Sequence, residues 1–526
     1  MTYKSSYSLY CAIVVSMGGF VFGFDASVIS GVIGFVSTEF NLTPIEAGFV
    51  VAAPTFSGLF ITLIIGPLSD YLGRKKVLII IAFLYLFSAL LSAFATSYAM
   101  LVAARAIGGL AFTSLMIAPL YIGEISPAAS RGTRVSINQL NIVVGLSAAY
   151  FTNYFILDLS TSGAEWVAAI GLEQHTWRWM LGLEILPALV FFLALFTIPD
   201  TPRWLMNQGR EDEAEEVVRK LLPAEEAVQE LDTIKHSSAV EHESLWERIG
   251  DIFGPKMRLA LVVGLIVAVT QQITGINAIF FYAPTIFEQS GIGTNAAFAQ
   301  AVMVGVTNVL FTFVAMALID KWGRKPLLIT GLVGIMVSMA VCTYGFAKAT
   351  YSITPESFIE IQQTEGIEDK FDTTQLAPLV GQSFTDDVSF KNALKEAIGM
   401  EAARDNESLL ISTSISINAI LILVGILGFV ASFAISLGPV MWVLFSEIFP
   451  TQLRGVAISF VSLVNGLVSF SVQLVFPVEL ATLGAAITFG LYGVFAAIGL
   501  ALVMWLLPET KGKSLEELET IFARKA

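Results

Sequence analysis

Two residues of opposite charge stand inside long apolar stretches of the sequence and could handle a proton. Asp25 lies in the apolar run 8–31 and Arg105 in the apolar run 99–122. A charge at the centre of a membrane helix costs at least ~2.5 kcal/mol, so each of these residues needs a partner or a function. An aspartate that pairs with a cation in only one conformation changes its proton affinity between conformations. A proton-coupling site and a permanent structural salt bridge both remain open on this evidence.

Side-chain amides form a second set of polar residues within apolar stretches. They are Gln139, Gln271, Gln272, Asn277, Asn308 and Asn465. Amides offer both donors and acceptors, as sugar hydroxyls do, and an aromatic such as Trp442 can lie against the apolar face of a sugar ring. Any one amide is better explained as a hydrogen bond between helices, but the close spacing of Gln271, Gln272 and Asn277 favours a binding site. Gln272 and Asn277 could face one cavity if the helix loosens around Gly275.

The elements that must position these residues are membrane-spanning helices. The chain has 526 residues, of which 55% are hydrophobic and 14% charged, so a bilayer is the expected solvent. Apolar runs long enough to cross a hydrocarbon core recur about twelve times. We place the spans at residues 8–31, 46–68, 76–96, 99–122, 137–158, 178–198, 258–283, 297–319, 326–347, 411–444, 456–477 and 483–507. The expected fold is therefore an all-α membrane protein.

Two charged phrases occur twice, which predicts two related halves. Gly66–Lys76 resembles Ala317–Lys325, and Gly123–Gly132 resembles Ser446–Gly455. Repeats of hydrophobic helices with a site between them are typical of secondary transporters. We therefore predict a six-helix half at 1–200, a helical linker at 201–256, a second six-helix half at 257–510 and a tail at 511–526.

The distribution of charge predicts how the chain is oriented. The net charge is −14, yet basic residues gather in alternate loops, which the positive-inside rule places in the cytoplasm together with both termini. The opposite loops are acidic or uncharged, and the longest of them, about 349–409, should face outward. We interpret that loop as a solvated insertion in preference to a functional lid.

Charged residues at the cytoplasmic span ends are expected to form a gate. They are Asp70, Arg74, Glu124, Arg131, Asp320, Arg324, Glu447 and Arg454. Opposed charges can close one side of a transporter and separate when it opens. The same residues also serve as topological anchors, and the linker that follows the first half could act as a latch or merely connect the halves.

Several classes of function find little support in the sequence. The two cysteines, Cys11 and Cys342, lie in predicted spans, and the three histidines give no metal cluster. No nucleophile, base and orienting group form a catalytic set, so an enzyme is not expected. We also expect no cofactor, no metal and no nucleic acid partner, a retained first helix in place of a signal peptide, and a monomer in the bilayer.

With these residues assembled, the sequence resembles the sugar porter family of the major facilitator superfamily over nearly its whole length. The resemblance rests on Gly73-Arg74-Lys75, Pro119–Glu124 with Arg131-Gly132, Trp177–Gly182, Pro199–Leu205, Gln271-Gln272, Gly438-Pro439 with Trp442, and Pro508–Gly512. It implies proton coupling at Asp25 with Arg105 as its modulator. It further implies sugar contacts at Gln139, Gln271, Gln272, Asn277, Asn308, Trp442 and Asn465, with Phe22 as an aromatic wall.

Two departures from the family pattern limit the choice of substrate. Gly466 stands where glucose-type and xylose-type members commonly have tryptophan, and the acidic loop is longer than usual. The expected function is uptake of a monosaccharide or related polyol by proton symport with alternating access, in a plasma membrane (the inner membrane in a bacterium). A facilitative uniporter and a transporter-like sugar sensor are the alternatives.

Overall fold

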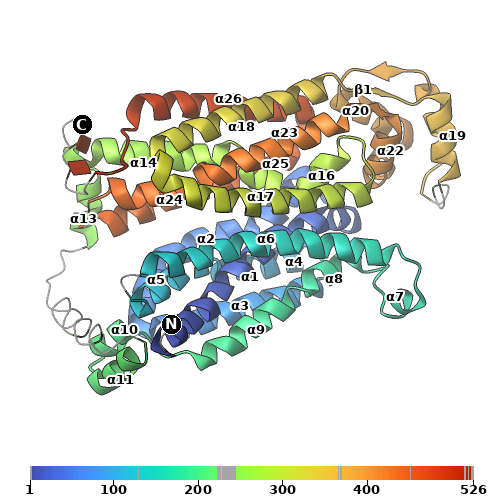
Figure 1. The fold of residues 1–526 in the computed structure, drawn as a ribbon. Coiled ribbons are helices and arrows are strands. Elements are labelled where there is room, and N and C mark those ends of the chain that lie inside the picture. Colours follow the sequence, from blue (N-terminus) through green and yellow to red (C-terminus); the bar gives the residue numbers. More distant parts are fainter. Residues whose placement is uncertain are drawn as a thin grey trace. The chain divides into compact units, whose positions relative to one another are not determined.

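The computed structural model describes residues 3–127, 130–221, 227, 231, 245–364, 367, 370–450, 452–513, 517, 518, 521 and 522. Within these residues, twelve helical segments are long and apolar enough to span a membrane, which confirms the predicted fold class (Figure 1). The chain divides into two compact units, residues 1–28, 53–152 and 178–253 against residues 29–52, 153–177 and 254–526. The predicted division at 200 and 257 follows the sequence repeat and stays a prediction.

The helices up to residue 253 form the first six spans and the segment after them. They are α1 (Tyr3–Glu39), α2 (Pro44–Leu72), α3 (Arg74–Ala93), α4 (Tyr98–Ala111), α5 (Ser114–Ile125), α6 (Arg131–Ser160), α7 (Glu165–Ala169), α8 (Thr176–Gly182), α9 (Ile185–Ala194), η2 (Leu195–Thr197), α10 (Pro202–Asn207), α11 (Glu211–Leu221) and α13 (Leu245–Ile252). The fourth span consists of α4 and α5, which are interrupted at Phe112 and Thr113.

The remaining residues contain the last six spans and an insertion. Their elements are η3 (Pro255–Met257), α14 (Arg258–Ile273), α15 (Ile276–Phe281), α16 (Ala283–Glu288), α17 (Thr294–Trp322), α18 (Arg324–Ala347), β1 (Thr350–Ser352), α19 (Pro355–Gln363), η4 (Thr373–Leu379), β2 (Ser383–Phe384), α20 (Asp387–Ile398), α21 (Met400–Asp405), α22 (Glu407–Ser414), β3 (Ile415–Ser416), α23 (Ala419–Ile435), α24 (Leu437–Ile448), α25 (Arg454–Thr482) and α26 (Gly484–Leu506).

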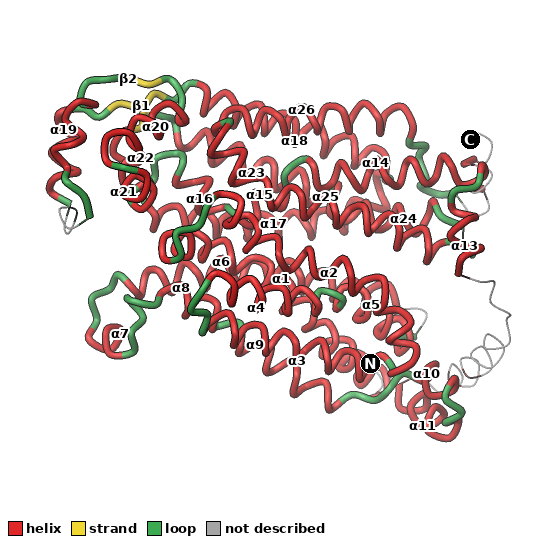
Figure 2. The backbone as a smooth tube through the Cα atoms, turned by 180° about the vertical axis from the view of Figure 1, so that it is seen from behind, coloured by secondary structure: helices red, strands yellow, loops and turns green. Residues whose placement is uncertain are grey.

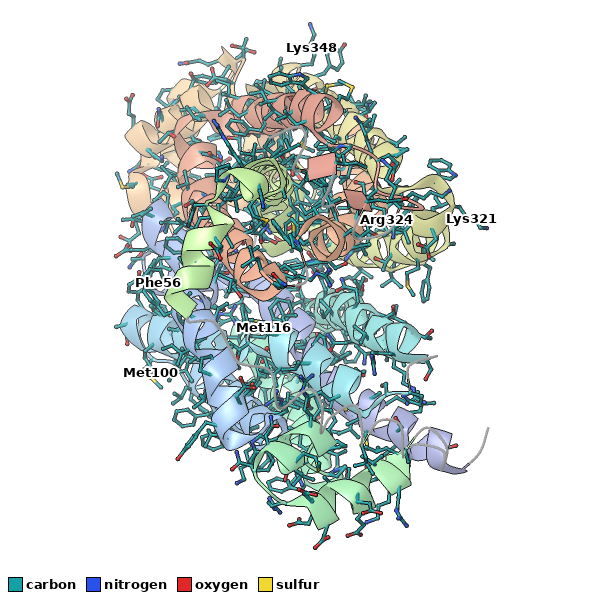
Figure 3. The ribbon with its side chains drawn as sticks, turned by 90° about the vertical axis from the view of Figure 1, so that its left-hand side faces the viewer. Phe56, Met100, Met116, Lys321, Arg324 and Lys348 are labelled. Carbon is teal, nitrogen blue, oxygen red and sulfur yellow. The ribbon has the colours of Figure 1, made fainter. Side chains whose placement is uncertain are left out.

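The apolar side chains of these helices fall into a buried set that packs the core and an exposed set that suits lipid. Fully buried residues of α1, α3, α5 and α9, such as Val15, Tyr85 and Phe191, form the core of the first unit. Other large apolar side chains remain exposed, and Phe56 and Met116, both labelled in Figure 3, are each 40% exposed. Exposed apolar side chains on helices with satisfied backbones suit a lipid environment.

The duplicated Gly-Arg-Lys phrase has a structural reason in each half. Gly73 separates α2 from α3 with φ of 92°, and Gly323 separates α17 from α18 with φ of 95°. Residues with a side chain rarely adopt such angles, so glycine is needed at both turns. The arginine that follows each glycine begins the next helix.

The segment at 349–418, called the insertion below, is folded, and it is longer than the predicted loop 349–409 because the tenth span begins at Ala419 and not at 411. Its three short strands form an antiparallel sheet in the order β2-β1-β3, with Tyr351 opposite Phe384 and Ile415. Strands β1 and β2 are labelled in Figure 2. Apolar residues of its helices pack into a separate core that contains Ile361, Phe390 and Leu410. The acidic composition hides this core because the acidic residues lie mostly at exposed positions between the apolar ones.

Candidate functional site

A buried ion pair in the first unit joins the two charges that the sequence singles out. Arg105 on α4 contacts the carboxylate of Asp25 on α1, and the side chains of the two residues are 2% and 1% exposed. Arg105 Nη1 also donates to the backbone carbonyl of Asp25 over 3.2 Å. Gly108, one turn further along α4, lies beside this pair, and a Cβ there would be 2.6 Å from Ser88 Oγ and 3.1 Å from Asp25 Oδ2.

A second buried acid, Glu184, belongs to the same cluster and was missed in the sequence. It lies between α8 and α9, is 2% exposed and interacts electrostatically with both Asp25 and Arg105. Oε1 of Glu184 and Oδ2 of Asp25 have no hydrogen-bond partner among the described residues. The signal was available, because Glu184 is an ionisable residue within the predicted span 178–198 and meets the same criterion as Asp25.

The amides of the seventh span lie together with Asn465 in the second unit. Gln271 Nε2 donates to the carbonyl of Leu437 over 3.0 Å, and Gln272 Nε2 donates to Asn465 Oδ1 over 3.2 Å. Asn465 Nδ2 donates in turn to Gln271 Oε1 over 2.9 Å. These side chains are 5% to 9% exposed and form one network of hydrogen bonds between α14, α24 and α25.

The break that brings Asn277 to this network occurs at Gly275. That glycine has φ of 93°, which ends α14 and lets α15 begin at Ile276. Asn277 Nδ2 then donates to Gln272 Oε1 over 2.8 Å, across five residues of sequence. The structure therefore places Gln272 and Asn277 in contact, as the sequence suggested for a helix loosened at this glycine.

Two further polar residues complete the network and were not anticipated. Ser469 Oγ accepts from Asn277 over 2.6 Å, and Gln473 Nε2 donates to the same oxygen over 2.8 Å. Asn465, Ser469 and Gln473 are spaced by four residues on α25 and therefore share one face of that helix. This spacing was readable in the sequence.

The other expected substrate residues lie outside this network. Gln139 is exposed on α6, and Phe22 packs edge-to-face against Phe112 with 4.7 Å between ring centroids. Asn308 is buried on α17, and Trp442 on α24 is 46% exposed. Gln139 and Phe22 belong to the first unit and the amide network to the second.

The charged residues of the first repeat form ion pairs within the first unit. Arg74 contacts Asp70 over 2.8 Å and Glu124 over 3.1 Å. Trp204 on α10 donates to the carbonyl of Asp70 over 3.1 Å, which docks the segment after the sixth span on this turn. Arg131 is exposed at the first residue of α6.

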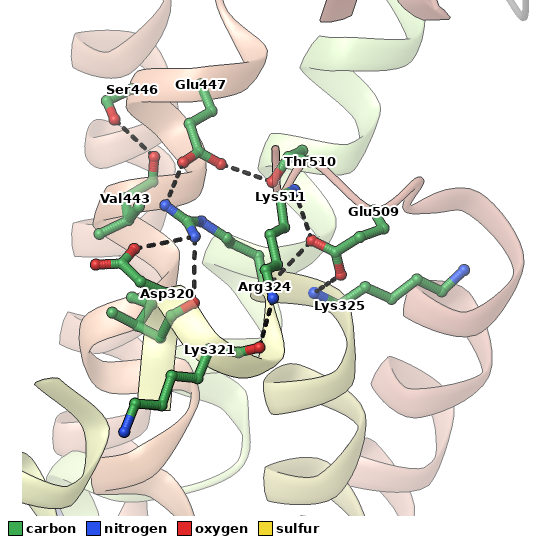
Figure 4. Close-up of polar contacts among 11 residues, drawn as sticks. Asp320, Lys321, Arg324, Lys325, Val443, Ser446, Glu447, Glu509, Thr510 and Lys511 are labelled. Carbon is green, nitrogen blue, oxygen red and sulfur yellow. Dashed lines mark hydrogen bonds and ion pairs between the residues drawn. The ribbon is translucent and has the colours of Figure 1, made fainter. Parts of the chain in front are cut away.

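The second repeat forms a matching set of contacts (Figure 4). Arg324 contacts Glu447 over 2.6 Å and Asp320 over 3.3 Å. The carboxylate of Glu509 accepts from the backbone amides of Arg324 and Lys325 over 3.1 and 3.0 Å. Arg454 donates to the carbonyl of Phe449 over 3.2 Å. Within the described residues, no group of three or more potential metal ligands lies together.

The fold and the sites define a class of protein, namely a membrane transporter with twelve spans and a repeated charged turn. The family model described as "Sugar (and other) transporter" matches residues 11–358 and 402–522. The chain therefore belongs to the sugar porter family of the major facilitator superfamily, as its motifs suggested. Residues 359–401, within the insertion, are not matched by the family model.

Individual relatives are similar over almost their entire length. The chain is 32% identical to an arabinose-proton symporter of Bacillus subtilis (strain 168), over 99% of this chain and 97% of the relative. It is 31% identical to a D-xylose-proton symporter of Escherichia coli (strain K12), over 99% and 96%. The inward open conformation of the xylose transporter XylE from E. coli superimposes with a TM-score of 0.74 at 29% identity, over 98% of this chain and 100% of that chain.

Proposed function

We propose that this protein imports a monosaccharide or related polyol by alternating access and couples each transport cycle to the entry of a proton. The observation that carries the proposal is the buried cluster of Asp25, Arg105 and Glu184. The amide network of the second unit supplies the chemistry for binding hydroxyl groups. The relatives named as pentose-proton symporters support the same combination of cargo and ion.

The charge of the cluster explains why a proton would bind there. Two ionised carboxylates and one guanidinium leave a net charge of −1 inside the membrane, which costs on the order of 2.5 kcal/mol or more. One proton on either carboxyl makes the cluster neutral. The oxygens of Asp25 and Glu184 that lack partners among the described residues are the atoms that could accept it. Asp25 is the proposed protonation site, and Arg105 is the group that modulates it.

The proposed cycle joins protonation to sugar binding. A proton from outside neutralises Asp25 and weakens its contact with Arg105, while sugar hydroxyls bind Gln139, Gln271, Gln272, Asn277, Asn308 and Asn465, with Phe22 and Trp442 against the ring. In the amide network, the sugar would replace the bonds of Asn277 to Gln272 and Ser469. The gate residues Asp70, Arg74, Glu124, Arg131, Asp320, Arg324, Glu447 and Arg454 then rearrange, and the proton and the sugar leave on the inner side.

The proposed setting is a plasma membrane, with both termini in the cytoplasm and a monomer as the working unit in lipid. The basic loops that include Arg74 and Arg324 support this orientation. The insertion then faces outward. The proposed role is transport and not catalysis.

Uptake into proteoliposomes tests the proposal. Labelled pentoses, hexoses and inositols are offered with and without an inward proton gradient, to the native protein and to Asp25→Asn. We expect native protein to accumulate one class of sugar above equilibrium only with the gradient, and Asp25→Asn to equilibrate it without accumulation. Accumulation that survives in Asp25→Asn would refute the assignment of Asp25, and equilibration by both proteins would identify a uniporter.

A further inference from the structure

The insertion contacts the connection between the seventh and eighth spans through a buried lysine. Lys391 on α20 is 9% exposed, and its Nζ lies 2.8 Å from Gln289 Oε1 and 2.9 Å from Glu407 Oε1. Gln289, directly after α16, also donates from Nε2 to Glu407 over 3.0 Å. Lys391, Glu407 and Gln289 thus form a closed triangle that joins two helices of the insertion to the end of α16.

Two carboxylates keep the lysine of this triangle charged in the docked structure. Burial lowers the pKa of Lys391, but the carboxylates of Glu407 and Asp387 outweigh burial and hold that pKa above its ordinary value. Burial likewise raises the pKa of Glu407, and Lys391 more than offsets it, so that pKa lies below its ordinary value. Asp387 Oδ2 lies 3.7 Å from Lys391 Nζ. Lys391 is therefore a cation with two carboxylate partners and one amide partner.

Close packing next to the triangle fixes the same connection. Gly291, in the turn that follows α16, has φ of 81°, and a Cβ at this position would lie 2.2 Å from Ile415 Cγ2 of β3. The hydroxyls of Thr294 and Ser408 lie 3.5 Å apart at the start of α17. The insertion therefore holds both the end of α16 and the turn after it (Figure 2).

The position of α16 affects the amide network because only the short helix α15 lies between them. Gly275 separates α14 from α15, and Tyr282 with φ of −129° separates α15 from α16. Between these two breaks, α15 has six residues and carries Asn277. A displacement of α16 can therefore shift Asn277 without bending a continuous helix.

We propose that the insertion is a clamp on the seventh span and that Lys391 is its positioning residue. Through Gln289, Lys391 holds α16, and α16 sets where Asn277 stands relative to Gln272 and Ser469. The inference rests on the proposed function, because it assigns Asn277 to sugar binding. It goes beyond that function by giving a role to residues that the family model leaves unmatched.

We expect the clamp to depend on pH, because Glu288 ends α16 directly before Gln289, which contacts Lys391 and Glu407. Burial raises the pKa of Glu288, the last residue of α16, to about 7; a hydrogen bond from Thr294 opposes this shift and the charge of Glu407 adds to it. The other charged groups around the triangle are Lys391 and Asp387, together with Lys395, whose charge lowers the pKa of Glu407. A third ionised carboxylate, at Glu288, would therefore repel Glu407 on the insertion.

Thiol labelling of α16 tests the clamp in the full-length protein. Thr285→Cys introduces a half-buried thiol on α16, and the natural Cys11 and Cys342 are both buried. We expect Lys391→Met to raise the rate of maleimide labelling at least threefold. Lys391→Arg should keep most of the native protection. Lys370→Met, at an exposed lysine of the insertion, is the matched control and should label at the native rate.

A second variant separates loss of the clamp from misfolding of the insertion. Gln289→Leu removes the partner on the transporter side but leaves the Lys391 to Glu407 ion pair intact, so it should also raise labelling. In sugar-exchange assays both variants should raise KM several-fold and change the maximal rate less than twofold. Native labelling rates in both Lys391→Met and Gln289→Leu, or equal acceleration in Lys370→Met, would overturn the proposal.

The labelling is measured without sugar and without a proton gradient. Failure of gradient-driven uptake would therefore refute the proposed function and leave the labelling result standing. Labelling that does not respond to the clamp variants would refute the clamp alone.

Discussion

Substitution of Gly275 by alanine tests whether the break in the seventh span is required for the amide network. A residue with a side chain in the left-handed conformation of Gly275 costs on the order of 1–3 kcal/mol. The added Cβ would also lie 2.4 Å from Cδ2 of Tyr492, well inside van der Waals contact. The ring cannot move freely, because its hydroxyl donates to Glu479 over 2.9 Å and it stacks on Phe476.

Backbone strain and overpacking together set the free energy that Gly275→Ala is expected to lose. Overpacking of a filled site costs typically about 1–3 kcal/mol, and the lower entropy of the unfolded alanine chain returns up to about 1 kcal/mol. The conformation with the break should therefore lose about 1–6 kcal/mol relative to native protein. Since 1.4 kcal/mol is a factor of ten, we expect Gly275→Ala to bind sugar about fivefold more weakly or worse.

Equilibrium binding of the transported sugar and thermal unfolding of purified protein measure this effect. The matched control is Gly455→Ala on α25, where an added Cβ meets no heavy atom within 4 Å. In a Tyr492→Leu background, where the overlapping ring is absent, Gly275→Ala should cost only the backbone strain relative to Tyr492→Leu alone. Binding and stability of Gly275→Ala equal to those of Gly455→Ala would show that the break at Gly275 is not needed.

Three further predictions concern other parts of the molecule. Because the pKa of Glu288 is raised from 4.5 to about 7 in the docked structure, docking is fully favoured below pH 4.5 and weakens as the pH rises to about 7, so labelling at Thr285→Cys, relative to a free thiol at the same pH, should accelerate over that range and Glu288→Gln should flatten this dependence. Arg105→Met leaves buried carboxyls without their cation and should lower the free energy of unfolding by about 3–5 kcal/mol, with partial recovery in Arg105→Lys by thermal unfolding. Trp204→Ala removes a buried indole and its bond to Asp70, so it should cost about 3–5 kcal/mol and lower the unfolding temperature more than Trp166→Ala, at a half-exposed position.

The spans could be predicted from the sequence because length and hydropathy decide them. Their interruptions were harder to locate. The break at Gly275 was expected, since glycine adjoins the polar residues that need it. The interruptions at Thr113 and Tyr282 were not expected. The second had a signal, because Pro284 in the first turn of α16 cannot donate a helical hydrogen bond, whereas no glycine or proline stands at Thr113.

Residues of the candidate site could be predicted only where a single residue type, such as a charge in an apolar run, indicates a function. Asp25 and Arg105 stand out as charges in apolar runs, and the structure brings them together. Glu184 had the same signal and was overlooked. Lys391 could not have been found, because Gln289 lies 102 residues away in sequence and only the folded insertion encloses the lysine.

The duplicated turns could be predicted from the sequence repeat, but the residues that cover them could not. Glycine at each turn leaves a space beside the backbone, and the segment after the last span of each half fills it. An added Cβ at Gly73 would meet the Trp204 ring at 3.0 Å, whereas one at Gly323 would meet the Glu509 carboxylate at 2.8 Å. The repeat therefore predicts where the turn lies and that a later segment can cover it. It does not predict the covering residue, because an aromatic ring and a carboxylate that accepts two backbone amides both satisfy the same space.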